Sequence, residues 1–571
     1  MPSASAARPQ DEFLGHPKGL FVCFFTEMWE RFSFYGMKAL LLLYLLKFHL
    51  FGDDAGYDVL GAYGGLVYAV PVLGGLLADR YLGMRKAVVF GGVLLVLGHL
   101  GMAYEGEPAR LVNGVVHRDD TALQVFYLSL ALIIMGVGFL KPNISTIVGK
   151  LYSDGDPRRD SGFTVFYAGI NVGAMLSALI CAFLGETYGW KYGFGAAGVG
   201  MLAGLCMFLW GQKYLEGHAE PRDPAKLRER VGPVSREWAI YLGAGLGVLL
   251  VWQLIQRTWT VHGTMHIIGA FLVVWFVWFI ATKCTKVERE QMLALAALLV
   301  GVLIFFVLYE QTYSSWLTFS DRLMTKDFFT VTRGTPSLPW AIFSLGASPP
   351  LMVAALVASD RGRRGVAKGL GALMAVGLVV ATMHDIVLVA QTAGSLTFLG
   401  AFWLVFFSPI FSWLWPWLER RGLNPSKPAK MAIGLALAGA SFVPMMAAVR
   451  AAQPGQPASV WWLALAYAVL EVGELAVMPI GLSAVTQLSV GRVVGLMMGA
   501  FWLATAYSEV LAAQFARLAS IEVPAGEAMD WAAAAAKYGD LFRLMACAGV
   551  AAGVFYLVLT PWIRRAMHGV K

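Results

Sequence analysis

Charged side chains are scarce in this sequence of 571 residues: they make up 14% of it, whereas hydrophobic residues make up 58%. Ordinary soluble domains carry about 25% charged and about 45–50% apolar residues. The basic residues are spread over connectors and form no single basic domain, so the net charge of +8 does not indicate nucleic-acid binding. The five cysteines are odd in number and form no C-x-x-C pair. The sequence therefore predicts neither a disulfide framework nor a metal site.

Apolar runs of about 20 residues recur along the whole chain, and each is long enough to cross a hydrocarbon core of about 30 Å as a helix. Because unpaired strand edges cannot face lipid, we expect an all-α integral membrane protein. The first run is too long and too charged for a cleaved signal peptide and should remain as a membrane anchor. The expected spans are 20–49, 57–79, 86–104, 122–149, 162–185, 191–211, 238–256, 263–282, 291–318, 397–418, 428–449, 459–488, 492–517 and 540–562.

The order of the spans predicts two six-helix halves separated by extra helices, an arrangement found in major facilitator transporters. The predicted parts are an N-terminal bundle at 1–211, a connector with two extra helices at 212–290 and a C-terminal bundle at 291–571. An insertion of two further helices is predicted at about 338–392, because that stretch holds more apolar sequence than a loop needs. The alternative is a re-entrant or interfacial pair. The total is then about 14–16 spans.

Basic connectors predict the orientation in the membrane, because short cytoplasmic loops are enriched in Lys and Arg. Both termini are expected in the cytoplasm. If the chain has sixteen spans, every basic connector lies on the cytoplasmic side, whereas fourteen spans would place the basic cluster at 361–364 on the external side. The other basic connectors that fall on the cytoplasmic side are 80–86, 158–159, 212–237, 420–421 and 564–565. The Ala532 to Ala536 run is expected in the last external connector.

Ionisable residues interrupt the first span. A charged side chain at the centre of a membrane helix costs about 2.5–3.5 kcal/mol, so such residues are rare and usually face a cavity. At 100° per residue, six polar or aromatic residues fall within about 140° of one helix face. They are Glu27, Glu30, Arg31, Phe34, Tyr35 and Lys38. This arc predicts one stripe that faces the interior of the helix bundle.

Spacing predicts how the charges of the stripe pair. Glu27 and Arg31 are i, i+4 neighbours, so Arg31 can neutralise Glu27 and leave Glu30 to a second cation. Lys141, deep in the fourth span, is the candidate. A carboxylate beside a movable cation can bind and release a proton, which favours a transport function. The alternative is a static buried ion pair that fixes helix packing.

Further carboxylates lie within later spans. Glu310 and Glu474 are each near the middle of an apolar run, Glu471 lies one turn before Glu474, and Glu509 is in the 492–517 span. Intramembrane carboxylates indicate a functional site. The alternative for each is a hydrogen bond to a neighbouring helix, which is also the alternative for Asn171 in the fifth span.

A long motif in the first span then identifies a family. Residues 27–36 read E-M-W-E-R-F-S-F-Y-G, which resembles the E-x-x-E-R-F-x-Y-Y-G signature of the proton-dependent oligopeptide transporters (POT or PTR2) of the major facilitator superfamily. Four further segments resemble the family's other motifs in the same order. They are 140–143, 166–173, 310–311 and 473–483. The resemblance covers essentially the whole chain except 338–392.

The resemblance implies a symporter that imports di- and tripeptides by alternating access, with protons as the coupling ion and no other cofactor. It implies a proton-coupling network of Glu27, Glu30, Arg31, Lys141 and Glu310. It implies peptide binding by Tyr35, Lys38, Tyr68, Lys141, Asn171, Glu310 and Glu474, with the peptide carboxylate on the Lys141 side and its amino group on Glu474. It further implies a bacterial-type cytoplasmic (inner) membrane as the location, lipid and small peptides as partners, and function as a monomer.

Some positions depart from the family pattern. Lys38 stands where the family usually has Arg, so its pairing with Glu310 should be easier to titrate. Phe34 replaces the first Tyr of the Y-Y-G, which removes a hydroxyl from the site. Gly61 stands where animal relatives have a His, and Glu509 where an Asn is common.

Other functional classes fit the residues less well. A membrane-embedded enzyme would need a catalytic set such as H-E-x-x-H, which the sequence does not contain, so we expect no catalytic residue. Within transporters, the alternative substrate is nitrate or a peptide-like compound, because relatives with such substrates share the E-x-x-E-R motif. Glu310 and Glu474 argue against an anion, since a site for an anion gains nothing from two carboxylates.

Overall fold

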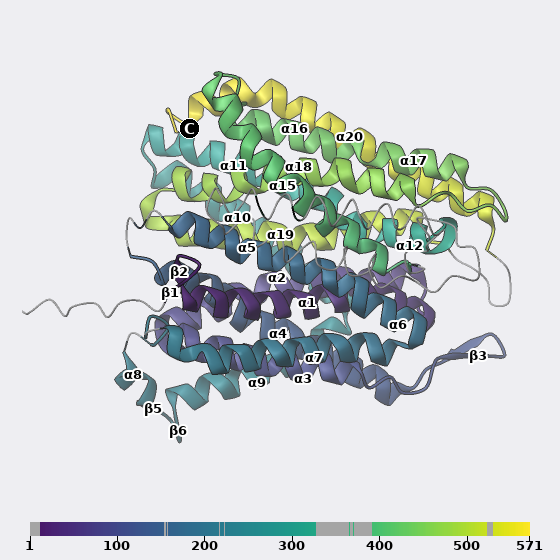
Figure 1. Cartoon of the computed structure of the whole chain (residues 1–571), viewed down its shortest axis with the longest axis horizontal. Coiled ribbons are helices and arrows are strands. Elements are labelled where there is room, and N and C mark those ends of the chain that lie inside the picture. The colour runs from purple at the N-terminus through teal and green to yellow at the C-terminus, as the bar shows by residue number, and fades with distance from the viewer. Residues whose placement is uncertain are drawn as a thin grey trace, which may run out of the picture.

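The computed structural model describes residues 12–153, 156, 158–215, 217–221, 223–326, 391–521 and 529–570, together with 365 and 369. Long helices dominate these residues and run roughly side by side (Figure 1). Most of the predicted insertion at 338–392 lies outside the described residues. The helices are α1 (Lys18–Lys47), α2 (Asp53–Leu77), α3 (Met84–Met102), α4 (Asp120–Lys150), α5 (Arg159–Ser177), α6 (Phe183–Tyr188), α7 (Trp190–Gly211), α8 (Pro224–Arg228), α9 (Arg236–Ile255), α10 (Thr258–Thr282), α11 (Lys286–Tyr309), α12 (Ser315–Leu323), α15 (Phe398–Arg420), α16 (Lys427–Ala440), α17 (Phe442–Ala451), α18 (Trp461–Leu488), α19 (Val494–Ala516) and α20 (Trp531–Ala566).

Within the described ranges, the strands form three small antiparallel hairpins outside the long helices. They pair β1 (Glu12–Phe13) with β2 (His16–Pro17), β3 (Arg110–Val112) with β4 (Val115–His117), and β5 (Arg230–Val231) with β6 (Val234–Ser235). The β3–β4 loop leads into α4, whose first turn is capped by Asp119. The Asp119 carboxylate accepts a hydrogen bond from the Ala122 backbone N–H at 3.0 Å. This backbone donation lowers the pKa of Asp119.

The fourteen predicted spans outside the 338–392 insertion are confirmed. In the described part of the chain, 13 helices are long and apolar enough to cross a membrane. α1 is not one of these 13 because of its charged residues, but its 30 residues exceed the length that a membrane crossing requires. The largest difference from the predicted boundaries is in the last span: the Ala532 to Ala536 run belongs to α20, which begins at Trp531. Alanine is the strongest helix former, and the cap at Asp530 extends the last helix through this run.

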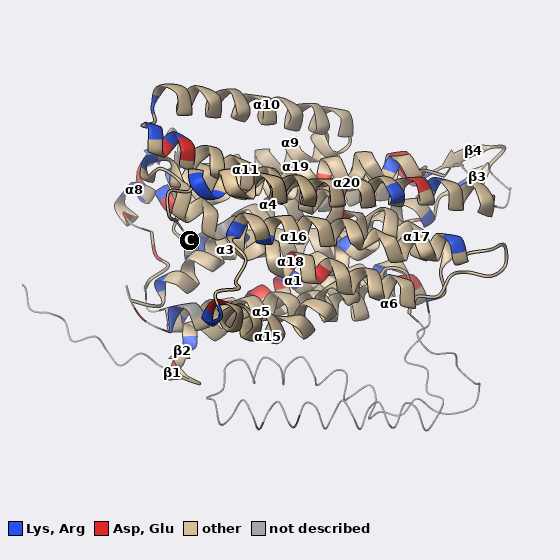
Figure 2. Ribbon diagram, turned by 90° about the horizontal axis from the view of Figure 1, so that it is seen from above, with Lys and Arg blue, Asp and Glu red and all other residues tan. Residues whose placement is uncertain are grey.

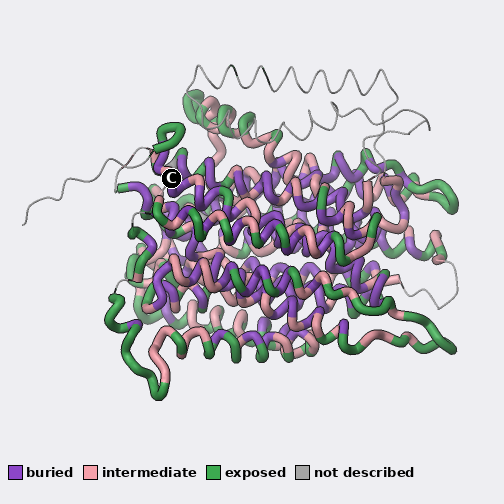
Figure 3. Tube along the Cα trace, turned by 60° about the horizontal axis from the view of Figure 1, so that its bottom comes forward, coloured by how far each residue is buried: buried purple, intermediate pink, exposed green. Residues whose placement is uncertain are grey.

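Two hydrophobic cores organise the helices. One is built mainly from α1–α7, which we call the N-terminal group, and the other mainly from α11–α20, the C-terminal group. In Figure 1 the N-terminal group is drawn in purple and blue and lies beside the green and yellow C-terminal group. Buried residues concentrate in the interior of both groups (Figure 3). Few residues of α9 and α10 are buried, and α10 lies at the edge of the helix bundle (Figure 2).

Chain direction defines two ends of the bundle. The β1–β2 hairpin and the end of α20 lie at one end, the termini end, and the β3–β4 hairpin lies at the other, the far end (Figure 1). The described connectors that were predicted to be basic and cytoplasmic all lie at the termini end, where Lys and Arg are dense (Figure 2). The basic cluster at 361–364 lies outside the described residues. The two flanks of the undescribed stretch, near 326 and 391, are both at the far end.

Candidate functional site

The charged stripe of α1 is buried inside the bundle. Glu27, Glu30 and Arg31 expose no more than 3% of their surface. Arg31 forms a two-pronged pair with Glu30: Nε donates to one carboxylate oxygen, and Nη2 donates to the other at 2.5 Å. Glu27 lies farther away, with 3.4 Å between its Oε1 and Arg31 Nε. The predicted pair of Arg31 and Glu27 is therefore present, but Arg31 binds Glu30 more closely. A guanidinium group can form two parallel hydrogen bonds with one carboxylate, and here that carboxylate is Glu30.

Lys38 connects α1 to the C-terminal group. Its Nζ lies 2.8 Å from Glu310 Oε2 and 2.7 Å from Glu509 Oε1. The ammonium also lies 4.6 Å from the centre of the Tyr313 ring. The predicted pair of Lys38 and Glu310 is confirmed, and Glu509 is an additional partner that the sequence did not place in the site.

A break in the predicted 291–318 span presents Glu310 to Lys38. α11 ends at Tyr309, a 3₁₀ turn spans Glu310–Tyr313, and α12 begins at Ser315. A stretch of 3₁₀ helix within a span often marks a hinge or a functional site. The span is thus not one continuous helix, and Glu310 is the first residue of the break.

Lys141 is held by aromatic rings. Its Nζ lies 4.5 Å from the centre of the Tyr68 ring and 5.3 Å from that of Trp502. Among the ion pairs formed by described residues, none includes Lys141, so its predicted pairing with Glu30 is not present. An ammonium over aromatic faces is weakly neutralised compared with one in an ion pair. Lys141 is partly exposed and can accept an anionic partner.

Aromatic and amide side chains lie around these charges. Tyr35 stacks on Tyr313 with 6.3 Å between ring centres, and the Arg31 guanidinium lies 5.8 Å from the Tyr35 ring. The Asn171 amide donates to the Tyr167 carbonyl oxygen of its own helix at 3.1 Å. This intrahelical bond differs from the alternative of a bond between helices. Tyr167 interacts electrostatically with Glu474 and Tyr35 and is nevertheless 41% exposed.

The C-terminal group supplies a second acidic cluster on α18. Glu471 is completely buried and Glu474 is 8% exposed. The Tyr309 hydroxyl lies 3.4 Å from Glu471 Oε1. The Oε2 atoms of both glutamates are buried and have no hydrogen-bond partner. A buried oxygen without a donor is costly, so this cluster is suited to a protonated or cationic partner.

Ion pairs join the two groups at the far end. Arg322 of α12 makes a two-pronged pair with Asp53 of α2, with distances of 2.6 and 2.7 Å. Lys47 Nζ lies 2.5 Å from Asp321 Oδ1. Arg517 pairs with carboxylates of α2 at 3.2 and 3.3 Å. All of these ion pairs link the N-terminal group to the C-terminal group at this end.

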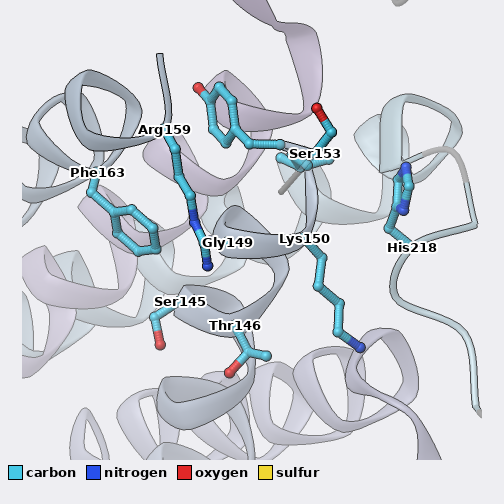
Figure 4. A pocket seen from close by; sticks show the side chains of 10 residues that line it. Ser145, Thr146, Gly149, Lys150, Ser153, Arg159, Phe163 and His218 are labelled. Atoms are coloured by element: carbon cyan, nitrogen blue, oxygen red, sulfur yellow. The ribbon is translucent and has the colours of Figure 1, made fainter. Parts of the chain in front are cut away.

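A cavity of about 540 Å³ lies at the termini end of α4 and α5 (Figure 4). Lys150, Arg159 and His218 line it together with several hydroxyls, and none of the predicted site residues does. Its lining comes from the N-terminal group and the residues just after it. It therefore does not combine the cations of one group with the carboxylates of the other, and we do not assign the substrate to it.

The site as a whole combines opposite charges from the two groups. In the N-terminal group the three cations of α1 and α4 outnumber the two carboxylates of α1, and they are Arg31, Lys38 and Lys141. The C-terminal group contributes only carboxylates to the described site, from α18, α19 and the turn after α11. A zwitterion can be held between such poles, and carboxylates of this kind can exchange protons as their ion pairs change. Sequence reasoning missed Tyr313 and Trp502, and it noted Glu509 without assigning it a role in the site. The signal for Glu509 was a carboxylate in an apolar span, whereas Tyr313 and Trp502 had none.

Comparison with known proteins gives consistent matches over the chain. The sequence matches the POT family over residues 85–333 and 375–531. The uncharacterized transporter YclF of Bacillus subtilis is 33% identical over 581 residues, which cover 98% of this chain and 97% of YclF. A di-/tripeptide transporter of Lactococcus lactis is 28% identical over 99% of both chains. The crystal structure of a peptide transporter POT in complex with sulfate superposes with a TM-score of 0.73 at 29% identity, over 99% of this chain and 98% of the other.

Proposed function

This chain belongs to the POT family, and on that basis we propose that it is a proton-coupled symporter that imports di- and tripeptides by alternating access. It is an integral membrane protein with the major facilitator fold. Peptide transport is supported by the names of its relatives and by the opposite charges of its two helix groups. We assign it no enzymatic activity, no catalytic residue and no metal. Protons are its coupling ion.

The unpaired poles of the site carry the proposal. A peptide at neutral pH has a carboxylate at one end and an ammonium group at the other. Lys141, which lies over the Tyr68 ring, is a positive pole that is free of ion pairs within the described residues. Tyr35, Tyr68 and Asn171 would bind the rest of the peptide on this side. Glu474 is a negative pole with a buried oxygen that lacks a donor. Nitrate would gain from the first pole only, so the carboxylates favour a peptide over nitrate.

Proton coupling would act through the ion pairs of α1. The network consists of Glu27, Glu30, Arg31, Lys141 and Glu310. Protonation of Glu310 removes the charge that attracts Lys38 and so weakens a link between the two groups. Lys38 and Glu310 also border the peptide site, which connects proton binding to substrate binding. One proton that moves inward contributes about 2.3 kcal/mol per 100 mV, which concentrates a neutral substrate roughly fiftyfold.

In alternating access, the far end and the termini end of the bundle would be closed in turn. The Asp53–Arg322 and Lys47–Asp321 pairs close the far end in this conformation. We place the termini end in the cytoplasm of a bacterial-type inner membrane, because basic connectors gather there. The structure then corresponds to a state closed to the outside. We further propose that the bundles 1–211 and 291–571 move as units around 212–290, and that a monomer in lipid suffices.

Uptake into liposomes tests this function. We expect labelled dialanine to accumulate when a proton gradient and an inside-negative potential are imposed, whereas labelled nitrate should not. Glu310→Gln and Lys141→Ala should abolish gradient-driven accumulation. Glu310→Gln should still exchange dialanine in counterflow, which needs no gradient. Full gradient-driven accumulation by Glu310→Gln would contradict the proposal, and uptake of nitrate alone would replace it with the alternative substrate.

A further inference from the structure

The Lys38 ammonium lies between two carboxylates that come from different elements of the C-terminal group. Glu310 opens the 3₁₀ turn after α11 and Glu509 lies on α19, at 2.8 and 2.7 Å from Nζ. The three side chains expose only 2%, 7% and 4% of their surface, respectively for Lys38, Glu310 and Glu509. We propose that Glu509 is a second proton-coupling carboxylate, which shares Lys38 with Glu310. The proposal deepens the function proposed above and rests on it.

Charge balance supports this role. Two ionised carboxylates and one ammonium leave the cluster with one negative charge in a buried site, which is costly. The other charged residues beside it are Glu27, Glu30 and Arg31 of α1 and Lys141 of α4. Lys141 interacts electrostatically with Glu27 and Glu30, so these two carboxylates and two cations balance one another and leave no positive charge for the Lys38 cluster. A proton that binds one oxygen of Glu310 or Glu509 forms a carboxyl group and makes the cluster neutral. Lys38 then stays paired with the remaining carboxylate.

The second carboxylate changes what protonation costs. With Glu310 as the only partner, a proton on Glu310 would leave the Lys38 ammonium buried and unpaired, which is strongly unfavourable. With Glu509 present, Glu310 can bind a proton while Lys38 keeps a partner. Glu509 should therefore allow the site to bind its proton at a higher pH than a single Lys38–Glu310 pair would.

The packing of α2 against α19 provides the room for Glu509. A β-carbon at Gly64 would lie 2.6 Å from both the Cδ and Oε2 atoms of Glu509, so glycine is required there for the carboxylate to occupy its place. Gly61, one turn earlier, lets α2 approach Ala513 in the same way. Small residues at such spacing allow close approach of membrane helices.

Besides Lys38 and Glu310, titratable groups from three other helices lie around this cluster. α2 contributes the Tyr63 and Tyr68 hydroxyls, which interact electrostatically with Glu509. α10 contributes His262, whose Nε2 would lie 3.6 Å from a β-carbon at Gly61 and which interacts electrostatically with Asp58. α18 contributes Glu474, which interacts with Glu310. Lys38 is thus the cation that pairs with Glu509 among the described residues.

The pH profile of dialanine uptake tests the proposal. We compare wild type, Glu509→Gln and the control Ser508→Ala, whose hydroxyl bonds only the Thr505 carbonyl oxygen of its own helix. Glu509→Gln should move the midpoint of the profile to lower pH by about one unit, a tenfold higher proton concentration, because Glu310 loses a like charge beside it. Ser508→Ala should keep the wild-type midpoint. A glutamate with only a structural role would lower the uptake rate and leave the midpoint unchanged.

A second variant, Gly64→Ala, tests the proposal independently in case Glu509→Gln folds poorly. Gly64→Ala places a methyl group where the Glu509 carboxylate lies and should produce the same acid shift. If wild type exchanges dialanine in counterflow but both variants keep the wild-type midpoint, the role of Glu509 is wrong and the peptide function stands. If wild type exchanges no dialanine, the peptide function fails, and the role of Glu509 fails with it.

Discussion

The pair of Asp53 and Arg322 should control which end of the transporter is open. Arg322 donates to Asp53 at 2.6 and 2.7 Å, and Asp53 also accepts from the Ile521 backbone N–H at 2.9 Å. Asp53 is 5% exposed, so these charge-assisted bonds are poorly screened by solvent. Hydrogen bonds to charged groups contribute about 1.5–3 kcal/mol. Because this pair joins the two helix groups, Asp53→Asn should shift the balance toward the state open at the far end, roughly 10- to 150-fold.

Spin-label distances measure this shift. Labels at Lys191 and Arg450, in a variant without the five native cysteines, report the separation of the two groups at the far end. We expect Asp53→Asn to add a population at longer distance. Asp540→Asn is the matched control, because it breaks an exposed pair within α20 at the same end. If Asp53→Asn gives the same distance distribution as wild type and the control, the pair does not close the far end.

Three further experiments test the site and the helix packing. Glu474→Gln should raise the KM for dialanine about tenfold or more, through the loss of a charged hydrogen bond to the amino group. It should leave the weak binding of an N-acetylated dipeptide unchanged, and equal effects on both substrates would contradict the assignment. Arg31→Ala should cost about 3–5 kcal/mol of stability, because it leaves buried carboxylates unpaired. Arg31→Lys should cost less, and thermal unfolding in detergent compares the two. Gly74→Ala should lower the melting temperature because its methyl group would overlap the Gly138 carbonyl oxygen, whereas Gly243→Ala, which meets no neighbouring atom, should not.

The spans could be predicted from the sequence because hydrophobic length is a local property. A run of about 20 apolar residues must cross the membrane wherever it lies in the chain. The charged stripe of α1 was also predictable, since helical periodicity places Glu27, Glu30, Arg31 and Lys38 on one face. The start of α20 was predicted nine residues too late, because the Ala532 to Ala536 run is less hydrophobic than the span it extends.

The partners within the site could not be predicted, because they depend on the depth and rotation of helices that are distant in sequence. Spacing allowed Arg31 to pair with Glu27, but the geometry of the guanidinium favours Glu30. Lys141 was expected to pair with Glu30 and instead lies over Tyr68. Glu509 reaches Lys38 because α2 has a glycine at Gly64, and this requirement is visible only when α2 and α19 are packed together.

Movement of protons on addition of peptide tests the central claim most directly. Purified transporter is placed in liposomes that contain a pH-sensitive dye, with an inside-negative potential and no initial pH gradient. We predict that dialanine added outside acidifies the lumen, that nitrate does not, and that Glu310→Gln abolishes the acidification. Entry of labelled dialanine without acidification of the lumen would contradict proton-coupled peptide import.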